Sequence, residues 1–426
     1  MTGYIRTIRA FGQAVGLYFI ATALVGFAFD GGVYAVLLNL FLVRLGYGPE
    51  LIGLINSAGT LTFALSSLPA GALGERFGSR RIMMLGIGIM LCGGVLQPLA
   101  DTIPHDWRLP WLLANGIALY FGLALFFVNT APFVMQMVGA AQRNRVFSLQ
   151  TALISLAAFG GSLAGGVLPP AAAAILGTTL SSPAPYRYAL LVAGLALIPA
   201  LFAIRAARPP ALPKPAAADQ PVAPGGAAMV AVSITGLLTM MALVRLLQIA
   251  GLAATNTFYN VYLDSVLLLP TTQIGAIVAA GRLLGVPAAL ATSALAARFG
   301  NRGVVIGTSL ATSLAILPIA FIPHWSAAAF TFIGVTGLSW IRYAASIVYF
   351  LEIVPPARRA TVSGVTEMAA GLCFTAVAFG GGYMIAALGY QALFLTGAAL
   401  TAISALAFWL AFRRREPRPE PSIATT

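Results

Sequence analysis

Charged residues are scarce in this chain. Of its 426 residues only 8% are charged, whereas 59% are hydrophobic, and the mean hydropathy is +0.92. A soluble domain carries about 25% charged residues, so most of this surface cannot face water. Apolar runs of about 20 residues recur from end to end, each long enough to cross roughly 30 Å of hydrocarbon. The composition therefore excludes an ordinary soluble protein and predicts an all-α membrane protein.

Residues that usually build catalytic or metal sites are also scarce. The two cysteines, Cys92 and Cys373, lie inside apolar runs, and the two histidines, His105 and His324, lie in loops. None of them has a partner at the spacing of a metal site or beside a plausible catalytic partner. The chain also has no phosphate-binding loop of the G-x-x-x-x-G-K-S/T kind, which argues against ATP as an energy source. We therefore expect no enzyme activity, no metal and no cofactor.

The net charge of +13 suits nucleic-acid binding at first sight, but the positions of the basic residues indicate otherwise. Eighteen of the 24 Lys and Arg residues lie in the tails and in alternate loops between apolar runs. The intervening loops hold only Arg44, Arg108 and Arg187. This asymmetry follows the positive-inside rule. We expect both termini in the cytoplasm, basic loops that contact anionic lipid, and no nucleic-acid partner.

The apolar runs predict twelve membrane spans, and an even number agrees with both ends lying on one side. The expected spans are 14–43, 50–73, 82–102, 110–138, 147–172, 187–205, 229–264, 272–296, 303–322, 327–352, 361–388 and 391–411. A Pro- and Ala-rich stretch at 207–226 reads as a cytoplasmic linker. We therefore expect an N-terminal six-helix bundle at 1–206, a C-terminal one at 227–412, and a cytoplasmic tail at 413–426.

The two halves repeat each other. The sequence NLFL at Asn39 matches NVYL at Asn260, and Pro49 matches Pro270, at the same separation. The tripeptide RFG and an I-P-H string recur at nearly the same separation. Such a constant offset predicts two bundles related by an axis along the membrane normal.

A cluster of charges stands between the second and third spans. The stretch GALGERFGSRR, at 71–81, places four charged residues in one short loop. Its second copy, SALAARFGNRG at 293–303, keeps the R-F-G-x-R core but has Ala297 in place of Glu75.

With this loop, the chain resembles the major facilitator superfamily of secondary transporters, of the bacterial type with twelve spans. The resemblance covers nearly the whole chain and includes the loop signature G-x-x-x-D/E-R-x-G-R/K-R/K. The residues that match this signature are Gly71, Glu75, Arg76, Gly78, Arg80 and Arg81. The resemblance implies two six-helix bundles with pseudo-two-fold symmetry and a cavity lined by spans one, four, seven and ten.

Two bundles that rock about a central site need contacts that hold in one state and break in the other. We expect the six signature residues to form such a conformational latch, because Glu75 can meet the positive N-terminus of a helix. The resemblance implies that this helix is span eleven, starting near Ala360. The alternative is a tight basic turn that only aids topology.

Charges inside the spans need a reason, because a charged side chain at mid-bilayer costs at least about 2.5–3.5 kcal/mol. Asp30 lies near the middle of span one and is the proton-coupling candidate, since low dielectric disfavours the charged form of a carboxyl group. Its alternative role is as a structural partner of a buried arginine. Arg342 and Glu367 form a candidate structural ion pair between neighbouring spans.

Polar and aromatic residues share helical stripes on the spans that should line the cavity. The substrate-cavity candidates are Tyr34, Asn115, Asn129, Arg245, Asn256, Tyr259, Arg282, Trp340 and Arg342. Arg245 could instead extend its charge toward the cytoplasm.

These features predict a secondary active transporter in the plasma (inner) membrane that moves a small organic solute by alternating access. Proton coupling and export of amphiphilic or drug-like compounds are favoured. The alternatives are an organic-anion or (lyso)lipid transporter, because the deep arginines outnumber the deep acids, and a nutrient uptake symporter. The expected partners are the solute, protons and membrane lipids, and the chain is expected to be a monomer.

Overall fold

The computed structural model describes residues 12–208, 227–355 and 358–412, and within these ranges the chain is almost entirely helical, without a β-strand. The first half comprises α2 (Gln13–Ala28), α3 (Val33–Arg44), α4 (Pro49–Phe77), α5 (Ser79–Leu96), η1 (Gln97–Thr102), α6 (His105–Met137), α7 (Ala140–Leu176), α8 (Ala184–Leu195) and α9 (Leu197–Ala206). The second half comprises α10 (Ala227–Ser265), α11 (Thr271–Leu283), α12 (Gly285–Phe321), α13 (Trp325–Glu352) and α14 (Arg359–Phe412). Most of the linker expected at 207–226 and the tail expected at 413–426 lie outside the described residues.

Ten helical segments of the described chain are long and apolar enough to cross a membrane. Two long helices change direction at a glycine with a positive φ, Gly300 in α12 and Gly389 in α14. If α14 is divided at Gly389 and α12 at Gly300, α14 supplies two spans. The first part of α12 then forms one span together with α11, and the second part forms another. This arrangement is consistent with twelve spans. Gly78 joins α4 to α5 with φ 91°, so both copies of the R-F-G motif turn on a glycine in the left-handed region.

The first predicted span is interrupted, whereas the sequence suggested one continuous helix from 14 to 43. Helix α2 ends at Ala28 and α3 begins at Val33, with Asp30 in the break. Gly31 has φ +83°, and a methyl group on Gly32 would overlap the Phe27 carbonyl. The two glycines therefore make the break possible, because no larger residue fits that backbone path.

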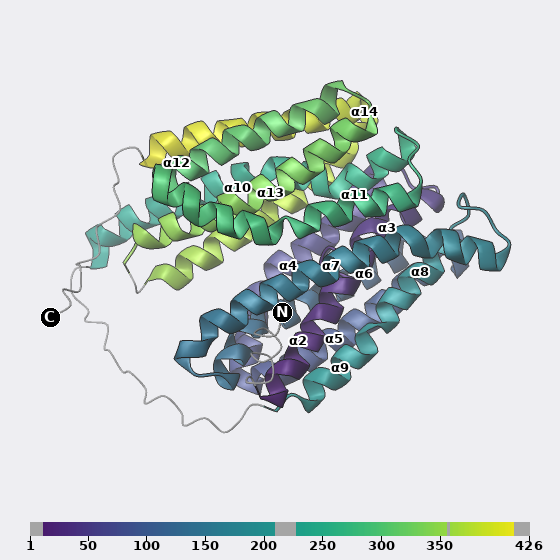
Figure 1. The fold of residues 1–426 in the computed structure, drawn as a ribbon, viewed down its shortest axis with the longest axis horizontal. Helices are drawn as coiled ribbons and strands as arrows, with labels where there is room; N and C mark the ends of the chain where they lie inside the picture. The colour runs from purple at the N-terminus through teal and green to yellow at the C-terminus, as the bar shows by residue number, and fades with distance from the viewer. Residues whose placement is uncertain (1–11, 209–226, 356–357, 413–426) are drawn as a thin grey trace.

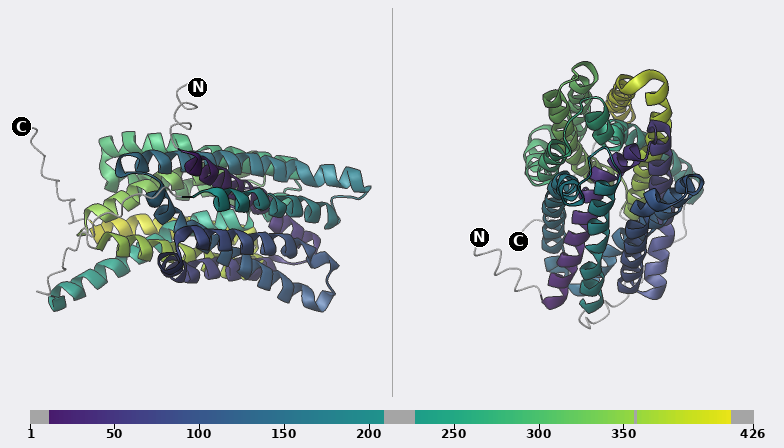
Figure 2. Two further views of the ribbon diagram at one scale, coloured as in Figure 1. Left: turned by 90° about the horizontal axis from the view of Figure 1, so that it is seen from below. Right: turned by 90° about the vertical axis from the view of Figure 1, so that its right-hand side faces the viewer.

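The helices run side by side along one direction and form two bundles (Figure 2). We call the end of the molecule where α4 meets α5 the Gly78 end, and the end where α4 begins the Pro49 end. The two bundles lie against each other near the Pro49 end and separate toward the Gly78 end, where α9 ends and α10 begins (Figure 1).

Two helix pairs hold the bundles together, α4 with α14 and α7 with α11. Both pairs pack through glycine. An added methyl group on Gly53 would collide with the Ala378 carbonyl, and one on Gly275 would lie 2.6 Å from Gly166 Cα. The backbones therefore touch directly, which gives a close contact between apolar helices. The two pairs are related by the pseudo-two-fold symmetry of the halves.

Large apolar side chains cover the outside of the molecule as well as its core. Leu68, Ile175 and Leu314 are 66–85% exposed. A soluble protein rarely exposes so much apolar surface, so these side chains fit a lipid environment.

Candidate functional site

A cavity of about 180 Å³ lies between the two halves, and both contribute to its walls. Of the sequence-predicted cavity residues, Tyr34, Asn256 and Arg282 line it. The other polar lining residues are Asn39, Asn56, Thr60, Gln97, Tyr120, Thr257 and Asn260. Phe29, Phe332 and Phe374 supply aromatic surface. The cavity is thus rich in amides and aromatic rings and contains one cationic side chain, Arg282.

Arg282 reaches across the boundary between the halves to the broken segment that carries Asp30. It lies about 16 Å along α11 from Thr271, near the middle of a span. A methyl group on Gly31 would lie 2.7 Å from Arg282 Nε, so the guanidinium packs directly on this glycine. Arg282 and Asp30 interact electrostatically, but within the described chain no hydrogen bond joins them. The Nε atom of Arg282 is buried without a hydrogen-bond partner among the described residues.

Asp30 is enclosed by helices, although the residue as a whole is accessible to solvent. Its electrostatic neighbours are Arg282 on α11 and Tyr120 on α6, and both of these line the cavity. The Gly31 carbonyl beside it accepts a hydrogen bond of 2.7 Å from Ser162 on α7, which supports the break. A carboxylate in this position can exchange protons with water and can sense a charge bound in the cavity.

A reciprocal pair of amides seals the cavity toward the Pro49 end. Asn39 on α3 donates to the Thr257 carbonyl on α10 at 2.7 Å. Asn260 on α10 donates back to the Ala35 and Val36 carbonyls on α3, at 2.7 and 3.2 Å. Asn39 also accepts from Asn56 at 2.8 Å. The N-x-x-L repeat of the sequence is therefore the contact between its two halves.

An ion pair closes the Pro49 end beyond these amides. Both terminal nitrogens of Arg44 bind the carboxylate of Asp264, at 2.6 and 2.7 Å. Arg44 Nε donates to the Leu180 carbonyl at 2.8 Å, and Nη2 lies 3.2 Å from the Tyr186 hydroxyl. Since Arg44 ends α3 and Asp264 lies in α10, the pair joins the two halves.

Several predicted cavity residues have structural contacts instead and are not among the residues that line this cavity. Asn115 donates to the Trp111 carbonyl one turn earlier in α6. Asn129 donates to the Ala70 carbonyl and so ties α6 to α4. Tyr259 donates to the Ala328 carbonyl and stacks on Phe332. Trp340 is 42% exposed.

The expected ion pair between Arg342 and Glu367 is not formed within the described chain. Arg342 is fully buried and donates to Thr312 and Ser339, both at 3.1 Å. Glu367 is exposed and interacts with Arg245, whose guanidinium lies 4.9 Å from the centre of the Tyr343 ring. Glu367 lies in the expected span, but its side-chain partners are Arg245 on α10 and Tyr343 on α13 rather than Arg342.

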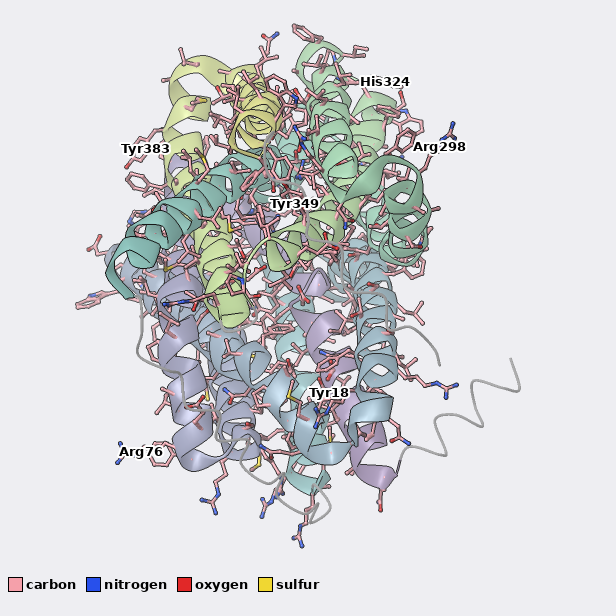
Figure 3. All side chains as sticks on the ribbon, turned by 90° about the vertical axis from the view of Figure 1, so that its left-hand side faces the viewer. Tyr18, Arg76, Arg298, His324, Tyr349 and Tyr383 are labelled. Carbon is pink, nitrogen blue, oxygen red and sulfur yellow. The ribbon has the colours of Figure 1, made fainter. Side chains whose placement is uncertain are left out.

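The signature loop lies at the Gly78 end, away from the contacts between the halves. Glu75, Arg76 and Arg81 are exposed, and among the described residues no hydrogen bond or ion pair engages Glu75. Arg80 donates to the carbonyls of Ile204 and Arg205, which caps the end of α9. Arg76 and its counterpart Arg298 point outward from opposite edges of the molecule (Figure 3). Among the described residues, Glu75 therefore shows no contact across the boundary between the halves, and its role as a latch stays a prediction.

Sequence reasoning missed Gln97, Tyr120, Arg44 and Asp264. No sequence pattern marked Gln97 and Tyr120 as cavity residues, because only tertiary packing places them there. Arg44 and Asp264 each stand at the end of a span close to an Asn of the repeat, and that symmetry could have suggested a contact.

Comparison with known proteins agrees with this architecture. The family model described as Major Facilitator Superfamily matches residues 18–376 and 242–426. The chain belongs to the major facilitator superfamily. It is accordingly a multi-pass membrane transporter rather than an enzyme, with two six-helix bundles.

Solved structures with a similar fold include transporters of several kinds. An auto-inhibited peptide transporter of the POT family is similar with a TM-score of 0.73 at 16% identity, covering 96% of this chain and 99% of that one. A D-xylose–proton symporter has a TM-score of 0.71 at 14% identity, covering 93% and 97%. A nucleoside transporter has a TM-score of 0.70 at 16% identity, covering 94% and 99%. At these identities the likeness shows the fold alone.

One curated relative matches in part. The methylenomycin A resistance protein of Bacillus subtilis (strain 168) is 35% identical over 109 residues, which are 25% of this chain and 22% of that protein. The matched stretch thus spans about a fifth of that relative.

Proposed function

We propose that this transporter is a secondary active carrier that moves a small organic solute by alternating access and couples the movement to protons at Asp30. The observation that carries the proposal is the placement of Asp30. The carboxyl group of a solvent-accessible residue lies in the break of the first span, within electrostatic reach of an arginine from the opposite half. A change in its charge therefore acts on both halves at once.

The difference between the two ends of the molecule supports alternating access. The Pro49 end is sealed by the reciprocal amides and by the Arg44–Asp264 pair, which all cross between the halves. The latch residues at the Gly78 end are exposed instead. Since the basic loops lie at the Gly78 end, the positive-inside rule assigns this end to the cytoplasm. The conformation is then open toward the cytoplasm, in the plasma (inner) membrane.

Two directions of transport have support. The printed name of the partial relative, a resistance protein, supports export. The neighbouring charges of Asp30 and Arg282 support uptake by symport, because a proton on Asp30 leaves Arg282 available to a solute in the same conformation. Solute flux in liposomes under a pH gradient of either sign distinguishes the two.

Asp30→Asn tests the coupling, because it preserves size and hydrogen bonding but removes the titrating group. Purified protein is placed in liposomes that contain a pH-sensitive dye, and a library of small organic solutes is screened for proton movement. We expect the variant to lose pH-driven accumulation of the solutes found while still binding them. Asp106→Asn is the matched control, because the Asp106 side chain is 98% exposed. Accumulation by Asp30→Asn at the wild-type level would contradict the proposal.

A further inference from the structure

Two residues that line the central cavity each carry a buried polar atom with no hydrogen-bond partner within the described chain. The two atoms are Arg282 Nε and Gln97 Oε1. Gln97 is 1% exposed as a whole residue. A buried polar group without a partner is destabilising, so each such group in a native structure needs an explanation.

Several other amides and hydroxyls of the cavity are already engaged, whereas within the described chain no hydrogen bond involves the side chains of Asn256 and Tyr120. Asn39 and Asn260 bind backbone carbonyls of the opposite half, and Asn56 binds Asn39. Thr60 lies 3.1 Å from the Thr375 hydroxyl across the α4–α14 contact. Among the buried polar atoms of the described lining residues, Arg282 Nε is a donor without a partner and Gln97 Oε1 is an acceptor without a partner, and a ligand can supply the missing partner of each.

The chemistry of the two groups is complementary to a ligand with two different polar ends. A guanidinium prefers a carboxylate or another oxyanion, which it can bind through parallel hydrogen bonds. A glutamine carbonyl oxygen accepts, so it requires a hydroxyl or N–H group on the ligand. Asp30 is the carboxyl group near Arg282, and it makes no hydrogen bond to that guanidinium within the described residues.

The size of the cavity limits the ligand further. A volume of about 180 Å³ is below the roughly 300–1,000 Å³ of sites for drug-sized molecules. The aromatic rings of Phe29, Tyr120 and Phe332 line it, and they offer flat surfaces to an apolar part of the ligand. A cavity of this size suits a compact solute.

We propose that the cavity binds a small organic anion that carries a hydroxyl or N–H group, with its anionic end against Arg282 and its donor against Gln97. This inference rests on the proposed function, because it takes the cavity as the solute site. It narrows the solute class from drug-like or lipid compounds to compact hydroxy or amino carboxylates and similar oxyanions.

Matched sets of probes test the inference with the purified full-length protein. Each set contains a hydroxycarboxylate, its analogue without the hydroxyl group, and its uncharged amide. The first set is lactate, propionate and lactamide. The second set is mandelate, phenylacetate and mandelamide. Binding is measured by calorimetry and by thermal stabilisation. We expect the hydroxycarboxylate of at least one set to bind about tenfold more tightly than either analogue. Equal binding within both sets, or absence of binding in both, would overturn the inference.

Two variants assign the ends of the ligand. Arg282→Gln should remove the preference for the carboxylate over the amide, and Gln97→Met should remove the preference for the hydroxyl, each with the other preference retained. Arg298→Gln is the control, because Arg298 is exposed at the edge of the molecule. If Arg282→Gln does not fold, Arg282→Lys retains the charge and should keep the carboxylate preference at reduced affinity. Unchanged preferences in both variants would overturn the assignment.

The outcome separates this inference from the proposed function. Tight hydroxycarboxylate binding without pH-driven flux would contradict proton coupling and leave the anion site standing. Proton-driven flux of a cationic or uncharged solute, with no hydroxycarboxylate binding, would contradict the anion site and leave proton coupling standing.

Discussion

Arg44 and Asp264 form a two-point ion pair that joins the first half of the chain to the second at the Pro49 end. Its side chains are 18% and 8% exposed, so water screens the pair only partly. A nearly identical pair, Arg187 with Asp101 at 2.7 Å, lies within the first half, with side chains 18% and 10% exposed. Among the described residues, one of these two pairs thus crosses between the halves and the other does not.

Arg44→Gln should open the Pro49 end. Hydrogen bonds to charged groups contribute about 1.5–3 kcal/mol, so the population should shift roughly 10- to 150-fold toward the state open at this end. Distances between spin labels on the ends of α3 and α10 measure the shift. Arg187→Gln removes the matched pair and should leave those distances unchanged. Equal responses of the two variants would show that the Arg44 pair is not a gate.

Gly275→Ala should act on the same equilibrium through sterics. Its methyl group would lie 2.6 Å from Gly166 Cα and from the Ser162 carbonyl, and overpacking of this kind costs about 1–3 kcal/mol. The variant should disfavour closure at the Pro49 end, seen as increased labelling of a cysteine placed beside Asn39. Gly88→Ala is the control, because a methyl group there meets nothing within 4 Å. Labelling that stays at the wild-type level would contradict this role for Gly275.

Glu75→Gln should weaken the state that is closed at the Gly78 end. In that state we expect Glu75 to meet the N-terminus of α14, a contact worth about 0.3–2 kcal/mol. Among the described residues Glu75 makes no hydrogen bond or ion pair, so folding stability should change little while transport slows. Spin labels on α5 and α14 at the Gly78 end report the distance. If the labels show the same distribution in both proteins, the signature loop is not a latch.

The linker provides a test of orientation. A tag inserted in 207–226, most of which lies outside the described residues, should be cytoplasmic, because the basic loops share that side. Impermeant reagents added to intact cells should fail to label it, whereas a tag in the loop after Leu176 should be labelled. Labelling of the linker from outside would reverse the assignment of the two ends.

Much of the fold could be predicted from sequence because it depends on local properties. Span length, the charge asymmetry of the loops and the R-F-G repeat all follow from the chain itself, and the superfamily assignment is confirmed. The break at Asp30 was harder to predict from the sequence. Two adjacent glycines indicated a close approach, but the sequence alone did not show that Arg282 packs on Gly31 or that Ser162 binds its carbonyl.

The cavity was harder to predict than the fold. Helical periodicity placed Asn115 and Asn129 on a polar stripe of α6, yet both amides bind carbonyls of their own or a neighbouring helix. The face of a helix that meets the cavity depends on its rotation within the bundle, and a single sequence does not encode that rotation in any local pattern. For the same reason Gln97 was not anticipated.

The reciprocal amides between α3 and α10 have a consequence for how such a chain could arise. Asn39 donates to the Thr257 carbonyl and Asn260 donates to the Val36 carbonyl, and these two bonds are symmetry equivalents of each other. This is the geometry of an isologous interface, in which one surface recognises a second copy of itself. A six-helix protein with a single N-x-x-L motif would form the same two hydrogen bonds when it dimerises. After gene duplication and fusion, the fused chain would therefore already contain the contact that closes the Pro49 end.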